Sequence, residues 1–483
     1  MSLSQPPQGQ RPSQTKIVAT IGPASTGRTA LVDLIVAGVD VFRINTAHGD
    51  RQEHQERLSA IREASRTVGS PVGVLVDLPG PKIRLGELPG GEVQCLPDAV
   101  LRFVRGPTPA GPNELTTTYE PLVDELAPGD RVMLADGTVS LVVVESGDDF
   151  AECRVVQPGL VRSRQGVNLP GVRLTVSTLG EIDRQNAVWA AENEVDFVGL
   201  SFVRSAEEVR QLKSLLASHG SAAQVIAKIE KPEALDNLTA IIEASDGVMV
   251  ARGDLGVEID IARTAVVQKQ IVAAANRLRK PVIIATQMLD SMQHSRLPTR
   301  AEVTDVANAI LDGADACMLS GETAIGQHPV EAVRMMHGIA LATEPIGRKR
   351  PPPPGPDLAS EGIDQITEAA AHAAGRLAEA LDARLVVVAS ASGETALSLS
   401  KNRNFVPTVG VSDSAATLRR MCLYWGVIPL AGAPTHQSSS LLRHVTDWGR
   451  AAGHLVGGDR IVLLTGSGVR GNTRNVIEVH QVE

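Results

Sequence analysis

Short apolar runs alternate with helical stretches from Lys16 onward. The runs are rich in Val and Ile, which is typical of buried parallel strands. They cover 16–22, 39–45, 72–78, 195–202, 224–230, 246–252, 280–286 and 314–320. Helical patterns such as 29–38 and 264–280 separate them. Eight strand–helix units predict an α/β fold, a (β/α)8 TIM barrel, over residues 16–81 and 174–345.

The barrel pattern is interrupted after its third strand. Residues 131–145 form two β-rich runs joined by Asp136-Gly137, a strong hairpin signal. Several further turns of the Gly-Pro type surround them. The interruption predicts a small β-barrel domain inserted at 82–173.

Two other regions lie outside the barrel pattern. Four consecutive prolines at 351–354 predict a stiff, extended linker over 346–360. A C-terminal α/β domain at 361–483 is then expected. It would have a helix at about 362–381 and strands at 385–390, 407–412, 427–432 and 459–466. The first fifteen residues are polar, lack the apolar core of a signal peptide, and predict a flexible tail.

Composition excludes several classes of protein. The net charge is −9 and only 2% of residues are aromatic, which disfavours nucleic-acid binding. The four cysteines form no C-x-x-C motif, so neither a disulfide framework nor a zinc cluster is expected. No apolar run reaches the length of a membrane span. We therefore expect a cytoplasmic protein with no membrane partner.

Polar side chains occur at the C-terminal ends of at least six predicted strands. Active sites of TIM barrels form at these ends, so the side chains should converge on one mouth. Strand alternation places Val41, Arg43 and Asn45 on one face, and likewise Ile226, Lys228 and Glu230. The other residues at strand ends are Asp77, the Arg252-Gly253-Asp254 sequence, Thr286, Ser320 and Glu322.

This mixture of side chains predicts anion chemistry with a metal. Glu230 and Asp254 could hold one magnesium ion, or manganese, with water and substrate oxygens completing the shell. Arg43, Arg84 and Lys228 offer cationic donors to a phosphate. A glycine at position 253 lets backbone N–H groups approach an anion. These residues alone indicate a barrel enzyme that acts on a phosphorylated or carboxylated anion through a divalent metal.

Each of these residues also has a purely structural interpretation. Lys228 and Glu230 could form an ion pair at the barrel rim, and Arg43 could pair with Asp77. The Arg-Gly-Asp sequence could be a turn, and Thr286 could cap a helix. Their joint occurrence at equivalent strand ends favours the functional interpretation, because each structural explanation would have to hold separately.

Longer strings identify a family. KIVATIGPAS, FRINTAHGD, GVNLPG, AKIEKPEAL, MVARGDLGVEI, ATQMLDSM and the segment from 298 to 329 resemble pyruvate kinase in order and spacing. The resemblance runs from about Lys16 to the end of the chain and is strongest in the barrel. It implies magnesium-dependent transfer of a phosphoryl group from phosphoenolpyruvate to ADP, giving pyruvate and ATP. It also implies a homotetramer and a lid that closes over the site.

The resemblance also implies roles for single residues. Lys228 would face the transferring phosphoryl group and Arg43 would contact phosphate. Glu230 and Asp254 would ligate magnesium. Gly253 and Thr286 would hold the substrate carboxylate. Thr286, or a water near Ser320 and Glu322, would protonate the enolate. The nucleotide contacts would be Arg84, Asn45 and His48.

Three departures from the family pattern cluster together. Potassium-dependent members hold the ion with an Asn, a Ser, an Asp and a Thr. Asn45 and Asp77 persist here, whereas Ala47 and Leu78 replace the other two. Lys82 replaces a nearby Glu, so an ammonium can stand in for the monovalent cation. We therefore predict activity without potassium. The alternative is a surface lysine with no electrostatic role.

Two further positions bear on ligands. Ser205 stands where some members carry a nucleotide-contacting Lys, which puts one nucleotide contact in doubt. The loop SASGET at 390–395 resembles the family's effector loop for a sugar phosphate or nucleotide. Ser390, Ser392, Gly393 and Thr395 would form it, with Arg470 or Arg474 in the same pocket. The alternative is a capped turn without a ligand.

Rival functions remain open from the sequence. A magnesium-dependent barrel lyase or aldolase of enolpyruvate chemistry would explain the metal site, but not the inserted lid or the region of Arg84. A catalytically dead scaffold would be expected to lack Lys228, Glu230 or Asp254, and all three are present. A nucleic-acid-binding module is disfavoured by charge, and salt-sensitive RNA binding would revive it.

Overall fold

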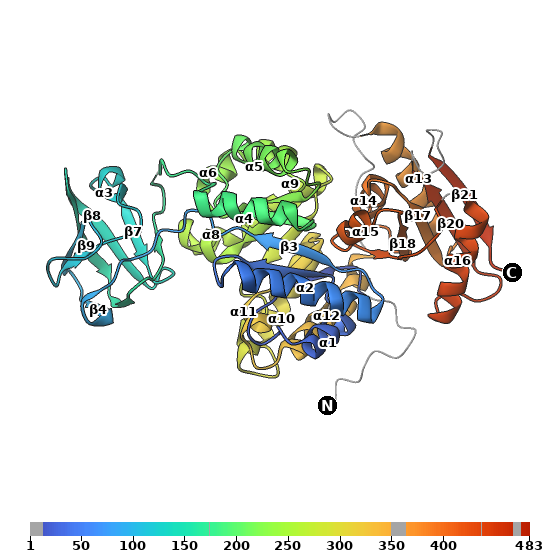
Figure 1. The fold of residues 1–483 in the computed structure, drawn as a ribbon, viewed down its shortest axis with the longest axis horizontal. Helices are drawn as coiled ribbons and strands as arrows, with labels where there is room; N and C mark the ends of the chain where they lie inside the picture. Colours follow the sequence, from blue (N-terminus) through green and yellow to red (C-terminus); the bar gives the residue numbers. More distant parts are fainter. Residues whose placement is uncertain (1–12, 173, 349–363, 436, 467–474) are drawn as a thin grey trace.

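The computed structural model describes residues 13–172, 174–348, 364–435, 437–466 and 475–483. Three bodies follow one another along its long axis (Figure 1). A β-rich domain lies at one end, a barrel in the middle, and an α/β domain at the other end. None of the described helices is long and apolar enough to cross a membrane.

The central body is a closed barrel of eight parallel strands, as predicted. Its strands are β1 (Lys16–Thr20), β2 (Val41–Asn45), β3 (Gly73–Asp77), β12 (Phe197–Leu200), β13 (Gln224–Ile229), β14 (Gly247–Ala251), β15 (Val282–Ala285) and β16 (Ala316–Leu319). Alternation along β2 follows the sequence pattern. Phe42 and Ile44 pack outward among the helices, whereas Val41 packs inside the barrel.

Helices surround the barrel, most of them on its outside and a few at its mouth. They are α1 (Arg28–Ala37), α2 (Arg51–Val68), α4 (Glu181–Glu192), α5 (Ala206–Ser218), α6 (Pro232–Asp236), α7 (Leu238–Ala244), α8 (Arg252–Glu258), α9 (Thr264–Arg277), α10 (Arg300–Asp312), α11 (Gly321–Ala324) and α12 (Pro329–Gly347). Two 3₁₀ turns, η2 (Ile261–Arg263) and η3 (Asp290–Gln293), accompany them. The loops that leave the C-terminal strand ends carry short helices such as α8, which shape the mouth.

The inserted domain, here called the lid, contains a six-stranded sheet and a two-stranded sheet. Its elements are η1 (Pro89–Gly91), β4 (Glu92–Cys95), β5 (Val100–Val104), β6 (Glu114–Leu115), α3 (Leu122–Glu125), β7 (Arg131–Leu134), β8 (Val139–Gly147), β9 (Phe150–Gln157), β10 (Gly159–Arg162) and β11 (Val167–Asn168). β7 and β8 form the predicted hairpin.

One segment closes the larger sheet of the lid. Residues 83–86 form backbone hydrogen bonds near one sheet edge, from Val167 N to Ile83 O at 2.9 Å. The same segment bonds near the other edge of the sheet, where Gly86 N donates to Thr116 O at 2.7 Å. The lid thereby curls into a small barrel with a hydrophobic core of its own.

The C-terminal domain is a five-stranded sheet in the order β19-β18-β17-β20-β21. Its elements are α13 (Gln365–Ala380), β17 (Leu385–Ala389), α14 (Glu394–Lys401), β18 (Thr408–Val411), α15 (Ala415–Met421), β19 (Val427–Pro429), α16 (Ser438–Ala451), β20 (Arg460–Thr465) and β21 (Val476–Gln481). Four strands were predicted. The fifth, β21, pairs antiparallel with β20 at the edge of the sheet and was not predicted.

The barrel and the C-terminal domain share one hydrophobic core. Val18, Leu75 and Phe197 from inside the barrel belong to the same buried cluster as Met421 and Tyr424. The C-terminal domain therefore closes the bottom of the barrel, opposite the mouth that carries the polar residues.

Two segments differ from the sequence expectations. Residues 13–15 belong to the predicted flexible tail, yet the backbone N–H groups of Gln14 and Thr15 donate to the Glu344 carboxylate at 2.9 and 2.7 Å. The tail is held there because α12 presents an acceptor to it. α12 also continues to Gly347, inside the predicted linker 346–360, and most of that linker lies outside the described residues.

Candidate active site

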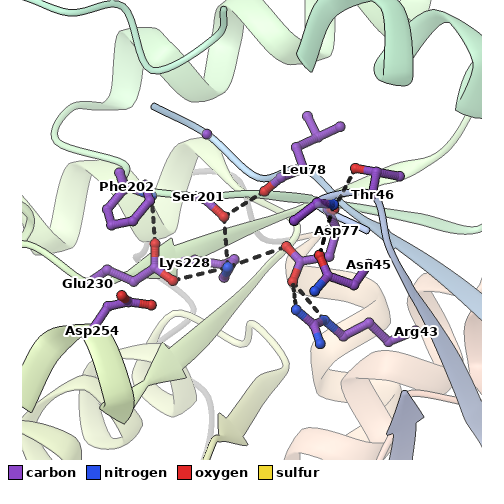
Figure 2. A network of polar contacts seen from close by, with 12 residues as sticks. Arg43, Asn45, Thr46, Asp77, Leu78, Ser201, Phe202, Lys228, Glu230 and Asp254 are labelled. Carbon is purple, nitrogen blue, oxygen red and sulfur yellow. Dashed lines mark hydrogen bonds and ion pairs between the residues drawn. The ribbon is translucent and has the colours of Figure 1, made fainter. Parts of the chain in front are cut away.

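The C-terminal ends of the barrel strands bring the predicted polar residues to one mouth. β2 supplies Arg43, β3 supplies Asp77, and β13 supplies Lys228, with Glu230 directly after it. Asp254 follows from the first turn of α8. Figure 2 shows Arg43, Asp77, Lys228 and Glu230 joined in one polar network, with Asp254 beside Glu230.

Lys228 lies at the centre of this network. Its Nζ donates to Ser201 Oγ at 2.7 Å and lies 3.0 Å from Glu230 Oε1 and 3.4 Å from Asp77 Oδ1. Burial lowers the pKa of Lys228, but the two carboxylates, Asp77 first, outweigh burial and raise it above its usual value. The amine therefore stays a cation at neutral pH.

Ser201 is a site residue that the sequence analysis missed. It follows β12, and its hydroxyl donates to the carbonyl oxygen of Leu78 at 2.7 Å. Its oxygen is thereby oriented to accept from Lys228. The available signal was a small polar residue near the end of the predicted strand 195–202, which is too common to be singled out.

Asp77 pairs with Arg43, as the structural interpretation of Arg43 proposed. Arg43 Nε and Nη2 lie 2.7 and 2.6 Å from Asp77 Oδ2. Burial would raise the pKa of Asp77, but the nearby Lys228 and Arg43 charges outweigh it and hold this pKa below its usual value. One buried carboxylate thus orients both cations at the mouth.

Glu230 and Asp254 are suited to a divalent cation. Phe202 N donates to Glu230 Oε2 at 2.7 Å, while Glu230 Oε1 has no hydrogen-bond partner although it lies beside Lys228. Burial raises the pKa of Glu230, and Lys228 opposes this rise. The described residues contain no cluster of three or more His, Cys, Asp or Glu that could hold a metal. Two carboxylates fit magnesium, which takes its other oxygens from water and substrate.

Thr286 has a strained backbone at the end of β15. Its φ is 68°, which is rare for a β-branched residue and costs about 1–3 kcal/mol. Gly253 N donates to Thr286 Oγ1 at 2.7 Å, and Arg252 Nη2 donates to Thr286 O at 2.8 Å. Thr286 therefore does not cap the helix that follows, and Arg252 is a further residue whose role here was not predicted.

The Arg-Gly-Asp sequence is not an isolated turn but the first turn of α8. A Cβ at Gly253 would lie 3.4 Å from Thr286 Oγ1, so the missing side chain permits this close approach. Gly253 and Thr286 thus meet at the mouth, as the predicted carboxylate site requires.

Ser320 and Glu322 lie at the end of β16. The carboxylate of Glu322 accepts from Leu289 N at 3.0 Å and from Ser320 N at 2.7 Å, so it braces the loop after β15. The hydroxyl oxygen of Ser320 is buried and has no partner among the described residues.

The three predicted nucleotide contacts lie apart from this network or at its rim. Asn45 Oδ1 accepts from Ala47 N at 3.1 Å, and His48 is exposed. Arg84 Nη1 donates to the carbonyl oxygen of Arg164 in the lid at 3.1 Å. Within the described part of the chain, these three side chains form no hydrogen bond or ion pair with one another.

The ammonium of Lys82 does not lie beside Asn45 and Asp77, where the prediction of a substitute for potassium places it. Lys82 Nζ lies 3.1 Å from Asp254 Oδ1. Figure 2 shows Asp254 on the other side of Lys228 from Asp77 and Asn45. Ser205, the fourth departure, is the N-cap of α5, where its N–H donates to Glu208 at 3.0 Å.

The predicted effector loop lies between β17 and α14. Gly393 has a φ of 95°, and its N–H donates to Ser390 Oγ at 3.0 Å. Glu394 N donates to Ser392 Oγ at 3.3 Å. Thr395 is buried in the first turn of α14. The hydroxyls of the loop thus already occupy two of its N–H groups. Arg470 and Arg474 lie outside the described residues.

Known proteins resemble this chain over nearly its whole length. The model of the pyruvate kinase barrel domain matches residues 12–333, and that of the pyruvate kinase alpha/beta domain matches 368–480. A pyruvate kinase of Geobacillus stearothermophilus is 39% identical, over 97% of this chain and 80% of that protein. A pyruvate kinase of Corynebacterium glutamicum is also 39% identical, over 97% of each chain.

Solved structures agree with these sequences. The crystal structure of a pyruvate kinase from Cryptosporidium parvum superposes with a TM-score of 0.89 at 32% identity. It covers 98% of this chain and 96% of its own. Sequence and fold lead to the same assignment. The chain belongs to the pyruvate kinase family of phosphotransferases.

Proposed function

We propose that the chain transfers a phosphoryl group from phosphoenolpyruvate to ADP, giving pyruvate and ATP, in a magnesium-dependent reaction. The observation that carries this proposal is the buried ammonium of Lys228, held between Asp77 and Glu230 at the mouth. Phosphoryl transfer depends on positioning and on stabilisation of charge, and a fixed cation supplies both.

The side chains at the mouth take distinct roles in this proposal. Lys228 and Arg43 bind the phosphoryl oxygens and stabilise their charge. Glu230 and Asp254 would hold magnesium, which neutralises phosphate charge when bound; manganese could replace it. Asp77 keeps Lys228 and Arg43 oriented, because it contacts both.

The carboxylate of phosphoenolpyruvate would bind where Gly253 and Thr286 meet. Gly253 N–H now donates to Thr286 Oγ1, so an anion at this place would take over that N–H group. The hydroxyl of Thr286, or a water near Ser320 and Glu322, would then deliver the proton to the enolate. The unpartnered Ser320 Oγ is suited to hold such a water.

The nucleotide would bind between the barrel rim and the lid. Arg84, Asn45 and His48 are the proposed contacts; Arg84 belongs to the lid, where it bonds to the carbonyl oxygen of Arg164, whereas Asn45 and His48 belong to the barrel. Closure of the lid would expel water, so that ADP rather than water receives the phosphoryl group.

We also propose that potassium is not required. Three carboxylates, from Asp77, Glu230 and Asp254, are contacted by three cations, from Arg43, Lys228 and Lys82. A Glu at position 82 would change this balance from 0 to −2, a deficit that a monovalent cation would relieve. The ammonium of Lys82 acts at Asp254 rather than beside Asn45, so it would substitute for the charge of potassium and not for its position.

Pyruvate formation from phosphoenolpyruvate and ADP with magnesium tests both proposals. The assay would run with tetramethylammonium chloride as the only monovalent salt, and then with potassium chloride at the same ionic strength. Full activity in the first buffer supports the reaction and the role of Lys82. Activity only with potassium supports the reaction and refutes the argument from Lys82. No activity in either buffer, from folded protein with candidate effectors present, favours a lyase or a scaffold.

We further propose an effector site, an oligomeric state and a cellular location. The loop of Ser390, Ser392, Gly393 and Thr395 would bind a sugar phosphate or a nucleotide as effector. The enzyme would be a cytoplasmic homotetramer. Sedimentation measures the assembly. A shift of the phosphoenolpyruvate saturation curve by a sugar phosphate or nucleotide, lost in Ser392→Ala, would identify the effector loop.

A further inference from the structure

The two ends of α8 face different surroundings. Its first turn carries Gly253 and Asp254 at the mouth. Its last residue, Glu258, is buried at the other end of the helix, with 4% of its surface exposed. Rigid secondary-structure elements are among the parts of a protein that can couple two sites.

Glu258 receives two donors from different domains. Lys231 Nζ donates to Glu258 Oε1 at 2.7 Å, and Asn168 Nδ2 donates to the same oxygen at 3.2 Å. Lys231 belongs to the barrel and directly follows Glu230, whereas Asn168 is the last residue of β11 in the lid. Asn168 is also buried, so water does not compete well for the bond between lid and barrel.

The lid touches α8 at two other points. Lys82, where the chain enters the lid, contacts Asp254. A Cβ at Gly137, in the turn of the predicted hairpin, would lie 3.5 Å from a Val257 methyl group. α8 is therefore a surface of the barrel on which the lid rests, and the Asn168–Glu258 bond is its buried part.

We propose that Asn168 is a positioning residue, which docks the lid on α8 by donating to Glu258. Docking fixes the helix that carries Asp254 and Gly253, so lid position and the shape of the mouth are coupled. The kinetic test of this inference rests on the proposed function, whereas the hydrogen-exchange test does not. A hydrogen bond to a buried charged group shifts such a docking equilibrium by about ten- to hundredfold.

The test compares Asn168→Ala and Glu258→Gln with their double variant. Gln157→Ala is the matched control, because the Gln157 amide donates to Thr138 O at 3.0 Å wholly within the lid. Substrates that bind the docked form restore docking at saturation. We therefore expect the KM for ADP to rise about tenfold in Asn168→Ala while kcat stays within about twofold. The double variant should be no worse than the poorer single variant.

Amide hydrogen exchange in the substrate-free protein gives a readout independent of activity. Exchange in the segments 165–169 and 252–258 should be at least about tenfold faster in Asn168→Ala and unchanged in Gln157→Ala.

Equal exchange in wild type and Asn168→Ala, or additive single effects, would overturn the inference. A lower melting temperature with unchanged KM and exchange would reduce Asn168 to a structural residue. If the wild-type protein makes no pyruvate, the proposed function fails, but the exchange experiment still tests whether Asn168 docks the lid. If Asn168→Ala does not fold, Asn168→Asp is the second variant. It keeps the shape of the side chain but replaces the amide donor by a carboxylate, which carries the same charge as Glu258.

Discussion

Replacing Lys228 by Met removes the cation at the centre of the site while keeping most of the side chain's volume. Asp77 retains its two contacts with Arg43, and Glu230 retains the N–H of Phe202. What disappears is the positive charge 3.0 Å from Glu230 and 3.4 Å from Asp77. The barrel should therefore keep its fold, whereas the transferring phosphoryl group loses its fixed cation.

The expected magnitudes follow from this geometry. Loss of one preorganised donor to developing charge costs about 10²–10³ in kcat, and a full buried charge belongs at or beyond the upper end of that range. Breaking a buried ion pair costs up to about 3–5 kcal/mol of stability. The loss here should be smaller, because burial already raises the pKa of Glu230 and the carboxyl group can take up a proton.

The assay is pyruvate formation at saturating substrates, with circular dichroism and thermal unfolding on the same sample. Lys213→Met is the matched control, since it also removes an amine 2.7 Å from a carboxylate, that of Asp246, far from the mouth. The control should retain wild-type kcat. Turnover of Lys228→Met within tenfold of wild type, in folded protein, would refute the role given to Lys228.

Three further predictions follow from described contacts. Burial lowers the pKa of Lys401 to about 7 despite its ion pair with Asp315. As the pH rises, the folded state loses this proton before the unfolded state does, so the free energy of unfolding should increase between about pH 7 and about pH 10.5. Chemical denaturation at several pH values measures this increase, which should be absent in Lys401→Met. Arg252→Lys should weaken the hold on Thr286 and lower kcat/KM for phosphoenolpyruvate by about tenfold to hundredfold, measured by steady-state kinetics. Gly393→Ala should destabilise the C-terminal domain by about 1–3 kcal/mol in urea unfolding, because φ there is 95°.

Local sequence was sufficient to predict the barrel strands and the lid hairpin. Strands that are buried on both faces show as Val- and Ile-rich runs, and Asp136-Gly137 defines a turn without reference to the rest of the chain. β21 escaped prediction because it is a partly exposed edge strand whose partner, β20, defines it. Its own residues carry no continuous apolar run.

The candidate site was predictable only as far as strand periodicity reaches. Alternation places Lys228 inside the barrel, two residues before Glu230, and the structure brings both to the mouth. The positioning of Thr286 by Arg252, and of Lys228 by Ser201, depends on contacts between different strands. The partner of Lys82 depends on how the lid leaves the barrel, which no local pattern encodes.

The core shared by the barrel interior and the C-terminal domain has a consequence for folding. Tyr424 and Met421 pack in the same cluster as Phe197 and Leu75, so neither region can lose its structure without exposing the apolar interior of the other. The lid has a separate core. Heating should thus give one cooperative transition for barrel and C-terminal domain together and another for the lid, and a chain truncated after α12 should aggregate rather than yield a working barrel.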